Sequence, residues 1–167
     1  MSEINPDIYL KVFDHAPLGL AISDETGAVV TANDTLLRIG GYGRDDLVGK
    51  SAADFYYDGP GYRDKVLAMV QANRGVLDRH ELRFKRKDGS FFWALMSLRP
   101  ASADGKRYMI AMIEDVHEMK HAEDENLRHT KELERMTQMM VGREMKMVDL
   151  KKRVQELESQ LAAKKKK

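Results

Sequence analysis

Residues 107–122, RYMIAMIEDVHEMKHA, contain the change of pattern that decides the architecture of this chain. The segment from Arg107 to Glu114 is almost wholly apolar, which is typical of a strand buried in a sheet. From Met119 onward the apolar residues recur every three or four positions, which indicates an amphipathic helix. We therefore expect a mixed α and β domain that continues directly into one long helix. The expected parts are an amphipathic helix at residues 1–14, a domain at 15–116, a helix at 117–163 and a lysine tail at 164–167.

The composition argues against several classes of protein. The chain of 167 residues has 28 basic and 27 acidic side chains, so its net charge of +1 gives no general case for nucleic-acid binding. It contains no cysteine, which excludes disulfides, thiolate metal sites and cysteine nucleophiles, and which fits a reducing compartment. The start MSEINPDIYLKVF shows no secretory leader, and no run of about 18 apolar residues is present to span a membrane. We expect a cytoplasmic protein that binds neither membrane nor nucleic acid.

The order of the predicted elements indicates an α+β fold. Two short strands, at residues 18–23 and 28–32, are followed by several helices, of which the longest covers residues 61–73. Three more strands are predicted at 77–86, 91–98 and 107–114, with a turn at 87–90 and a loop at 100–106. Strands at both ends and helices in the middle favour one antiparallel sheet with its helices on one face.

Short motifs punctuate this order. They are APLGL at 16–20, GAVVTAN at 27–33, GY at 41–42, LVGK at 47–50, ELR at 81–83, RKDGS at 86–90, Trp93, and EDV at 114–116. Together they resemble the PAS family over residues 6–120. The resemblance implies a five-stranded antiparallel sheet that encloses a small pocket with its helices. It also implies dimerisation and a signal that leaves through the last strand into a C-terminal helix. The signal hinge would be Asp115, Val116 and His117, although the family usually has Thr or Ser where this chain has His117.

PAS members bind haem, flavin, small organic ligands or nothing. The strands at 92–96 and 109–113 resemble those of LOV flavin photosensors, but the segment GKSAA at 49–53 lacks the cysteine that their photochemistry needs. Ala94 and Ile113 stand where flavin-binding members place amides, and apolar side chains leave the polar edge of a flavin unpaired. Haem-binding members usually supply a histidine from the long helix, and residues 61–73 contain none. We expect no flavin, haem or other cofactor.

The alternation of the strands predicts an apolar interior. Its candidate pocket residues are Leu20 or Ile22, Leu36, Met69, Leu82, Phe84, Ala94, Met96, Met109, Ala111 and Ile113. Two interpretations stay open at this point. The set is either a filled hydrophobic core, or the wall of an adaptable pocket for a small apolar ligand, since methionine side chains repack easily.

The C-terminal helix carries a seven-residue repeat typical of a coiled coil. Ten of the thirteen a and d positions between Met119 and Leu161 are apolar. The main positions of this predicted dimer seam are Met119, Asn126, Leu133, Met136, Met140, Arg143, Met147, Leu150, Val154, Leu157 and Leu161. A lone helix would expose the seam, so the simplest partner is a second copy of the chain. Facing charges do not decide the orientation of the pair, but the resemblance favours a parallel one.

Three polar residues interrupt the seam. Asn126 at an a position favours a fixed register and two strands. His129 would add pH sensitivity if it were buried against its twin. Arg143 at a d position, after Gly142, either extends its charge to water or marks a weak point where the coil can shift.

No pattern for catalysis is visible in the sequence. His129-Thr130-Lys131-Glu132 lacks the acidic residue and the proline of a kinase phosphoacceptor motif. We therefore expect a sensor that is not an enzyme and that passes a signal through the coil to a downstream signalling protein. The alternatives are a ligand-free scaffold that recruits a partner through the coil, or a fragment of a larger sensor kinase or transcription regulator.

Overall fold

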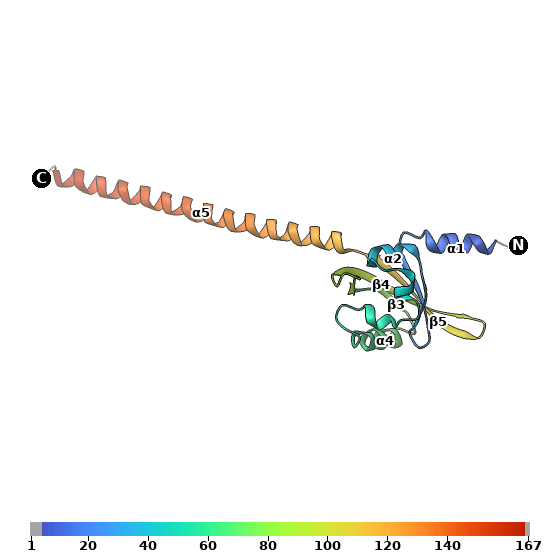
Figure 1. Ribbon diagram of the computed structural model, residues 1–167. Helices are drawn as coiled ribbons and strands as arrows, with labels where there is room; N and C mark the ends of the chain where they lie inside the picture. Colours follow the sequence, from blue (N-terminus) through green and yellow to red (C-terminus); the bar gives the residue numbers. More distant parts are fainter. Residues whose placement is uncertain (1–4, 166–167) are drawn as a thin grey trace. The chain divides into compact units, whose positions relative to one another are not determined.

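The computed structural model describes the backbone of residues 5–165 and the side chains of residues 5–158 (Figure 1). Its elements are α1 (Pro6–Asp14), β1 (Gly19–Asp24), β2 (Val29–Ala32), α2 (Asp34–Gly40), α3 (Arg44–Leu47), the 3₁₀ helix η1 (Ala52–Phe55), α4 (Tyr62–Ala72), β3 (Leu77–Lys85), β4 (Phe91–Ala103), β5 (Lys106–Asp115) and α5 (His117–Lys165). The chain divides into two compact units after Lys120. The predicted α+β fold, with a five-stranded antiparallel sheet and a long C-terminal helix, is confirmed.

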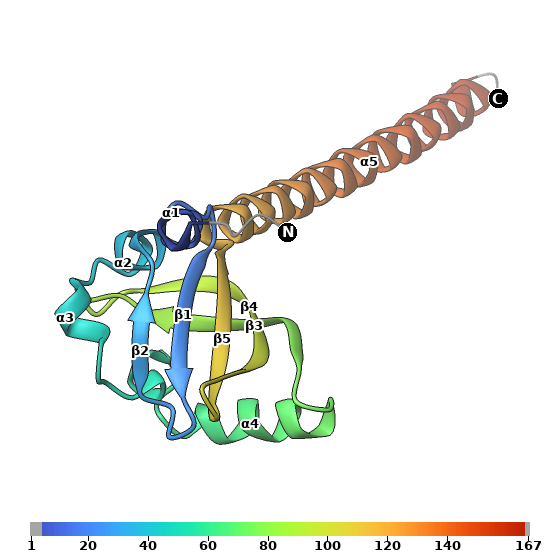
Figure 2. The same ribbon diagram turned by 90° about the vertical axis from the view of Figure 1, so that its right-hand side faces the viewer.

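The last strand of the sequence occupies the middle of the sheet. The strand order is β2-β1-β5-β4-β3, and every neighbouring pair is antiparallel. Figure 2 shows β2, β1 and β5 side by side. A strand with neighbours on both edges and side chains half-buried or buried on both faces is expected to be apolar throughout. This position explains the unbroken run Met109–Ile113.

The strand β4 is longer than the sequence predicts, so the expected loop at 100–106 is wrong. The chain stays extended to Ala103 and pairs with Lys106 across a tight turn at Asp104 and Gly105, both at positive φ. Pro100 favours a loop in the sequence, because a proline inside a strand cannot donate a backbone hydrogen bond to a neighbouring strand. The pairing of β3 with β4 ends at Leu98, so Pro100 lies where β4 has a neighbour on one edge only.

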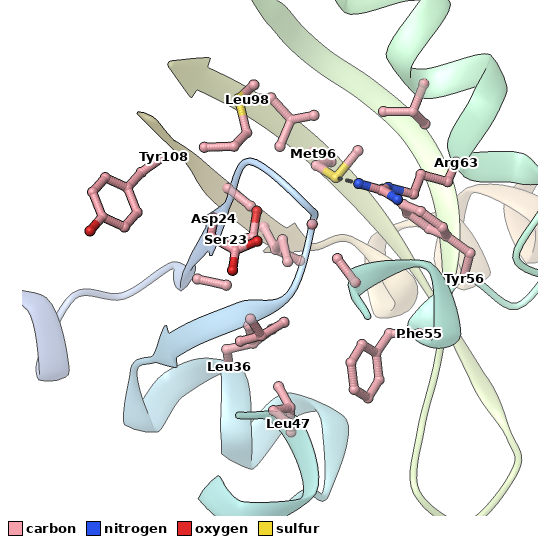
Figure 3. Close-up of a pocket in the computed structure, with 18 of the residues that line it drawn as sticks. Ser23, Asp24, Leu36, Leu47, Phe55, Tyr56, Arg63, Met96, Leu98 and Tyr108 are labelled. Atoms are coloured by element: carbon pink, nitrogen blue, oxygen red, sulfur yellow. Dashed lines mark hydrogen bonds between the residues drawn. The ribbon is translucent and has the colours of Figure 1, made fainter. Parts of the chain in front are cut away.

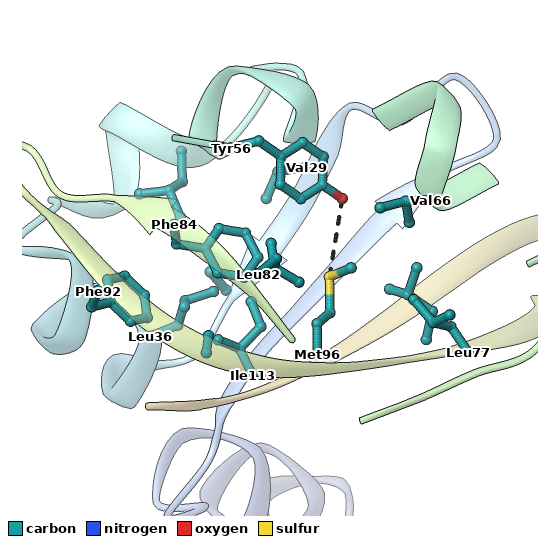
Figure 4. Close-up of a cluster of buried hydrophobic side chains, with 14 of the residues drawn as sticks. Val29, Leu36, Tyr56, Val66, Leu77, Leu82, Phe84, Phe92, Met96 and Ile113 are labelled. Carbon is teal, nitrogen blue, oxygen red and sulfur yellow. Dashed lines mark hydrogen bonds between the residues drawn. The ribbon is translucent and has the colours of Figure 1, made fainter. Parts of the chain in front are cut away.

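One buried cluster joins the helices to the inner face of the sheet (Figure 4). Leu36 of α2 and Val66 of α4 pack there with Phe92, Met96 and Ile113 of the sheet. By contrast, α1 contributes no buried residue, and four of its apolar side chains are exposed. The core is therefore built without α1, and helices α2 to α4 supply its second layer.

Asn33 ties the first strand to this layer from a fully buried position. Its Oδ1 accepts from the backbone N–H of Leu20 at 2.8 Å and from that of Leu36 at 3.0 Å. Its Nδ2 donates to the carbonyls of Phe13 and Leu18, both at 2.9 Å. The side chain thus caps α2 and satisfies three backbone groups of the segment that enters β1.

We expect Asn33→Ala to lower the free energy of unfolding by at least about 2 kcal/mol, because four backbone groups around this buried side chain lose their hydrogen bonds at once. Asn5→Ala removes the matching cap of the exposed helix α1 and should cost less than about 1 kcal/mol. Urea denaturation followed by the fluorescence of the single tryptophan, Trp93, measures both changes. Equal losses in the two variants would contradict the role given to Asn33.

Candidate functional site

A cavity of 430 Å³ lies between the inner face of the sheet and the helical layer (Figure 3). Most of its wall is apolar, and strands β1, β3, β4 and β5 and helices α2, α3, η1 and α4 all contribute to it. The volume falls in the lower part of the range of small-molecule sites, about 300–1,000 Å³. The interior is therefore not packed solid, and it has room for a small organic molecule.

The predicted pocket residues divide into three groups. The cavity wall includes Leu36, Phe84, Met96, Met109, Ala111 and Ile113. Leu82 and Ala94 are buried in the core and Met69 packs against it, but none of the three reaches the cavity. The prediction of Leu20 or Ile22 is wrong, because these residues lie opposite Met112 and Ile110 on the face of the sheet that points away from the cavity.

Small residues of β1 take the inner face in place of Leu20 and Ile22. Gly19, Ala21 and Ser23 lie opposite Ile113, Ala111 and Met109. A Cβ added at Gly19 would lie 3.0 Å from Cδ1 of Leu36, so α2 approaches this strand too closely for a large side chain. The large and small residues of β1 alternate strictly, and sequence reasoning assigned the large ones to the interior.

Tyr56 brings a polar group to the cavity wall that the sequence did not single out. The residue follows η1 and forms a bridge with Phe84 of β3, on which its ring stacks at 5.5 Å between centroids. Its hydroxyl donates to the Sδ of Met96 at 4.0 Å, which is a weak acceptor. Burial raises the pKa of Tyr56 to about 12.

Arg63 brings a positive charge to the same wall from the first turn of α4. Its Nη2 donates to the carbonyl of Thr26, in the turn between β1 and β2, at 2.8 Å. A Cβ at Gly27 would overlap the guanidinium, so the glycine leaves the space that Arg63 occupies. The contact joins residues 37 positions apart, and no local pattern in the sequence announces it.

The predicted hinge is a tight junction that packs on the sheet. The carboxylate of Asp115 accepts from the backbone N–H of His117 at 2.9 Å and pairs with Arg86 at 3.4 Å. The buried Val116 donates its backbone N–H to the carbonyl of Trp93 at 2.9 Å. The chain therefore passes from β5 to α5 while it is still hydrogen-bonded to β4.

Arg86 and His117 add contacts on either side of this junction. Arg86 also donates to the carbonyl of Ile39 and lies over the ring of Phe92 at 4.7 Å, so one side chain contacts α2, β4 and the hinge. The ring of His117 meets Phe91 edge-on at 5.9 Å, and its Nδ1 is buried without a hydrogen-bond partner. The histidine that breaks the family pattern is thus half-buried against β4.

The predicted seam residues lie on α5 as one stripe and are exposed in the single chain. Among the apolar ones, Met119, Leu133, Met136, Met140, Met147, Leu150, Val154 and Leu157 each have at least half of their surface accessible. Asn126 and Arg143 are exposed as well. The side chain of Leu161 lies outside the described residues. Leu127, Val141 and Val148 widen the stripe on one side.

The described part of the chain, residues 5–165, lacks two kinds of feature. No helix there is long and apolar enough to cross a membrane. No group of three or more His, Cys, Asp or Glu side chains there is placed to hold a metal ion.

Comparison with known proteins assigns the first unit to a family. Residues 17–118 match the family model of the PAS domain, and the chain belongs to this family. The resemblance predicted from the sequence motifs is therefore confirmed, and the unit is a sensor and signal-transduction module of the PAS type.

Among curated proteins, the chain is similar to the biofilm dispersion protein BdlA of Pseudomonas aeruginosa. The two are 35% identical over 92 residues, which cover 52% of this chain and 21% of that protein. The chain thus spans about a fifth of the length of this relative.

Two solved structures share the fold. An RNA-binding light-oxygen-voltage receptor has a TM-score of 0.63 at 20% identity, over 78% of this chain and 38% of that one. The PAS domain of a LuxR-family transcriptional regulator from Burkholderia thailandensis, in complex with ethanol, has a TM-score of 0.56 at 24% identity, over 65% and 96%.

We expect the stability of the protein to fall as the pH rises from about 10 to about 12. An unfolded tyrosine ionises near pH 10, whereas burial holds the pKa of Tyr56 at about 12, so deprotonation favours the unfolded chain in this window. The contribution is complete below pH 10 and is lost above pH 12. It amounts to about 2–3 kcal/mol.

Urea denaturation at a series of pH values measures this loss in the wild type and in Tyr56→Phe. The stability of the variant should decline less steeply with pH, because the hydroxyl of Tyr56 is gone. Some decline should remain, because burial also raises the pKa values of Tyr42 and Tyr62. An unchanged slope in Tyr56→Phe would show that Tyr56 ionises without opening the core.

Proposed function

We propose that this chain is a homodimeric sensor in which the PAS unit passes the state of its cavity through β5 and the hinge into a parallel coiled coil. One observation carries the proposal: β5 supplies Met109, Ala111 and Ile113 to the cavity wall, and it continues into the hinge without a loop. A molecule that presses on these side chains acts directly on the strand from which α5 starts.

The exposed stripe of α5 supports the homodimer. An isolated helix of this length gains little stability from local hydrogen bonds alone, so most of its stability has to come from packing. Pairing would bury the seam and stabilise the helix by about 25 cal/mol for each Å² of apolar surface removed from water. A parallel pair places both PAS units at the same end of the coil.

The remaining features of the proposal are those expected from the sequence. We propose a cytoplasmic regulator without a flavin or haem cofactor and without catalytic activity, which binds neither membrane nor nucleic acid and acts on a downstream signalling protein. The similarity to a PAS domain in complex with ethanol supports a small organic molecule as the signal.

We expect Met147→Lys to weaken the dimer at least about tenfold, because it places two charges in the seam. Met145→Lys is the matched control: this methionine of the same helix is exposed but lies at the outer f position of the repeat. Sedimentation equilibrium from one to a hundred micromolar should give a dimer for the wild type and for Met145→Lys. A wild-type monomer over this whole range would refute the proposal.

We expect a larger side chain inside the cavity to change the geometry of the coil. Ala111→Leu places a larger side chain of β5 in the cavity. Ala103→Leu adds the same leucine side chain at an exposed position of β4 that is not on the cavity wall. The chain has no cysteine, so Gln138→Cys carries a single spin label on the outer face of each helix.

Double electron-electron resonance then reads the distance between the two labels of the dimer. The distribution should change with Ala111→Leu and stay unchanged with Ala103→Leu. Identical distributions in both variants would refute transmission through β5 while leaving the dimer intact.

A further inference from the structure

A charged side chain with most of its hydrogen-bonding capacity unused lies on the wall of the apolar cavity. The guanidinium of Arg63 offers five N–H donors, and one of them bonds to the carbonyl of Thr26. No Asp or Glu within the described residues forms an ion pair with it. Arg63 is half-buried, so an anion in the cavity would meet its charge where water is partly excluded.

A second donor lies within the electrostatic reach of this cation. The hydroxyl of Tyr56 is on the same cavity wall, in a residue with only 7% of its surface exposed, and its acceptor is a thioether sulfur. Burial raises the pKa of Tyr56, and the positive charge of Arg63 lowers it by a smaller amount. Figure 3 shows both side chains directed toward Met96.

The two carboxylates on the cavity wall are already engaged. Glu25 pairs with Arg107 at 3.2 Å. The carboxylate of Asp24 accepts from the backbone N–H groups of Thr26 and Ala28 and from the hydroxyl of Thr26, at 2.6 to 3.1 Å. These bonds, above all that from the Thr26 hydroxyl, lower the pKa of Asp24. Neither group therefore supplies the counter-ion of Arg63.

We propose that the cavity binds an amphipathic monocarboxylate, whose apolar body lies among the core side chains and whose carboxylate accepts from Arg63 and Tyr56. A carboxylate matches the fork of a guanidinium and forms short, charge-assisted hydrogen bonds with it. The apolar body would contact Phe84, Met96 and Met109, side chains that adapt to a flexible chain or to a ring. This inference rests on the proposed sensor function and names the chemistry of its signal.

The probes that test it are octanoate and octan-1-ol, which share a hydrocarbon body and differ in charge. Calorimetry on the full chain should show tighter binding of octanoate. Arg63→Gln should weaken octanoate at least about tenfold and change the alcohol less than about twofold, because the amide keeps the polarity of the site but not its charge. Tyr56→Phe should weaken octanoate by a smaller factor.

A second pair of variants consists of one that displaces Arg63 without replacing it and one that serves as its control. Gly27→Ala places a Cβ where the guanidinium lies and should reduce the affinity for octanoate selectively. Gly59→Ala introduces an equally unfavourable positive φ, but the added Cβ meets no atom within 4 Å. It should leave the ratio of the two affinities unchanged.

The results separate this inference from the sensor function. Equal affinities for octanoate and octan-1-ol, equal losses of both in Arg63→Gln, or no binding of either probe would overturn the carboxylate site. The label distances of Ala111→Leu would still report on transmission in each of these cases. Tight octanoate binding that is lost in Arg63→Gln, with unchanged label distances in Ala111→Leu, would support the site and refute the transmission.

Discussion

The structure depends on the pairing of β5 along both of its edges. β1 binds one edge from Gly19 to Asp24 and β4 binds the other over ten residue pairs, so the final strand holds the two halves of the sheet together. The backbone groups of such a strand are satisfied on both sides, which fixes its position more firmly than that of an edge strand. Only Val116 separates the end of β5 from the first residue of α5, so the helix follows directly from the best-anchored strand of the domain.

The cavity lies against the inner face of this sheet, which the helical layer leaves partly unfilled. β1 turns small residues inward where α2 approaches closely, and the methionines of β4 and β5 line the same face of the sheet. Protein interiors are usually close-packed, so an unfilled volume of 430 Å³ sacrifices dispersion contacts that a solid core would make. A bound molecule would restore those contacts, and it would do so against the strand that leads to the hinge.

The two units are stabilised by different kinds of interaction. The PAS unit is stabilised by contacts between residues far apart in the sequence, such as the hydrogen bonds of Asn33 with Phe13, Leu18 and Leu20. Beyond Lys120, the hydroxyls of Thr130 and Thr137 bond to carbonyls four residues earlier in α5, and an apolar stripe is exposed between Leu127 and Leu157, so the stability of this helix depends on a second surface.

The sequence by itself determined the succession of strands along the chain and the change from a mixed domain to one long helix. Alternation with polar residues identified Leu82 and Phe84 as inward-facing, and the seven-residue repeat identified the helix. It could not orient β1, because Leu20 and Ile22 lie on a face that is also apolar, and periodicity then carries no information about which face is inside. Only the tertiary structure placed Arg63 beside Gly27, since these residues meet through the contact of α4 with a distant turn and not through any local pattern.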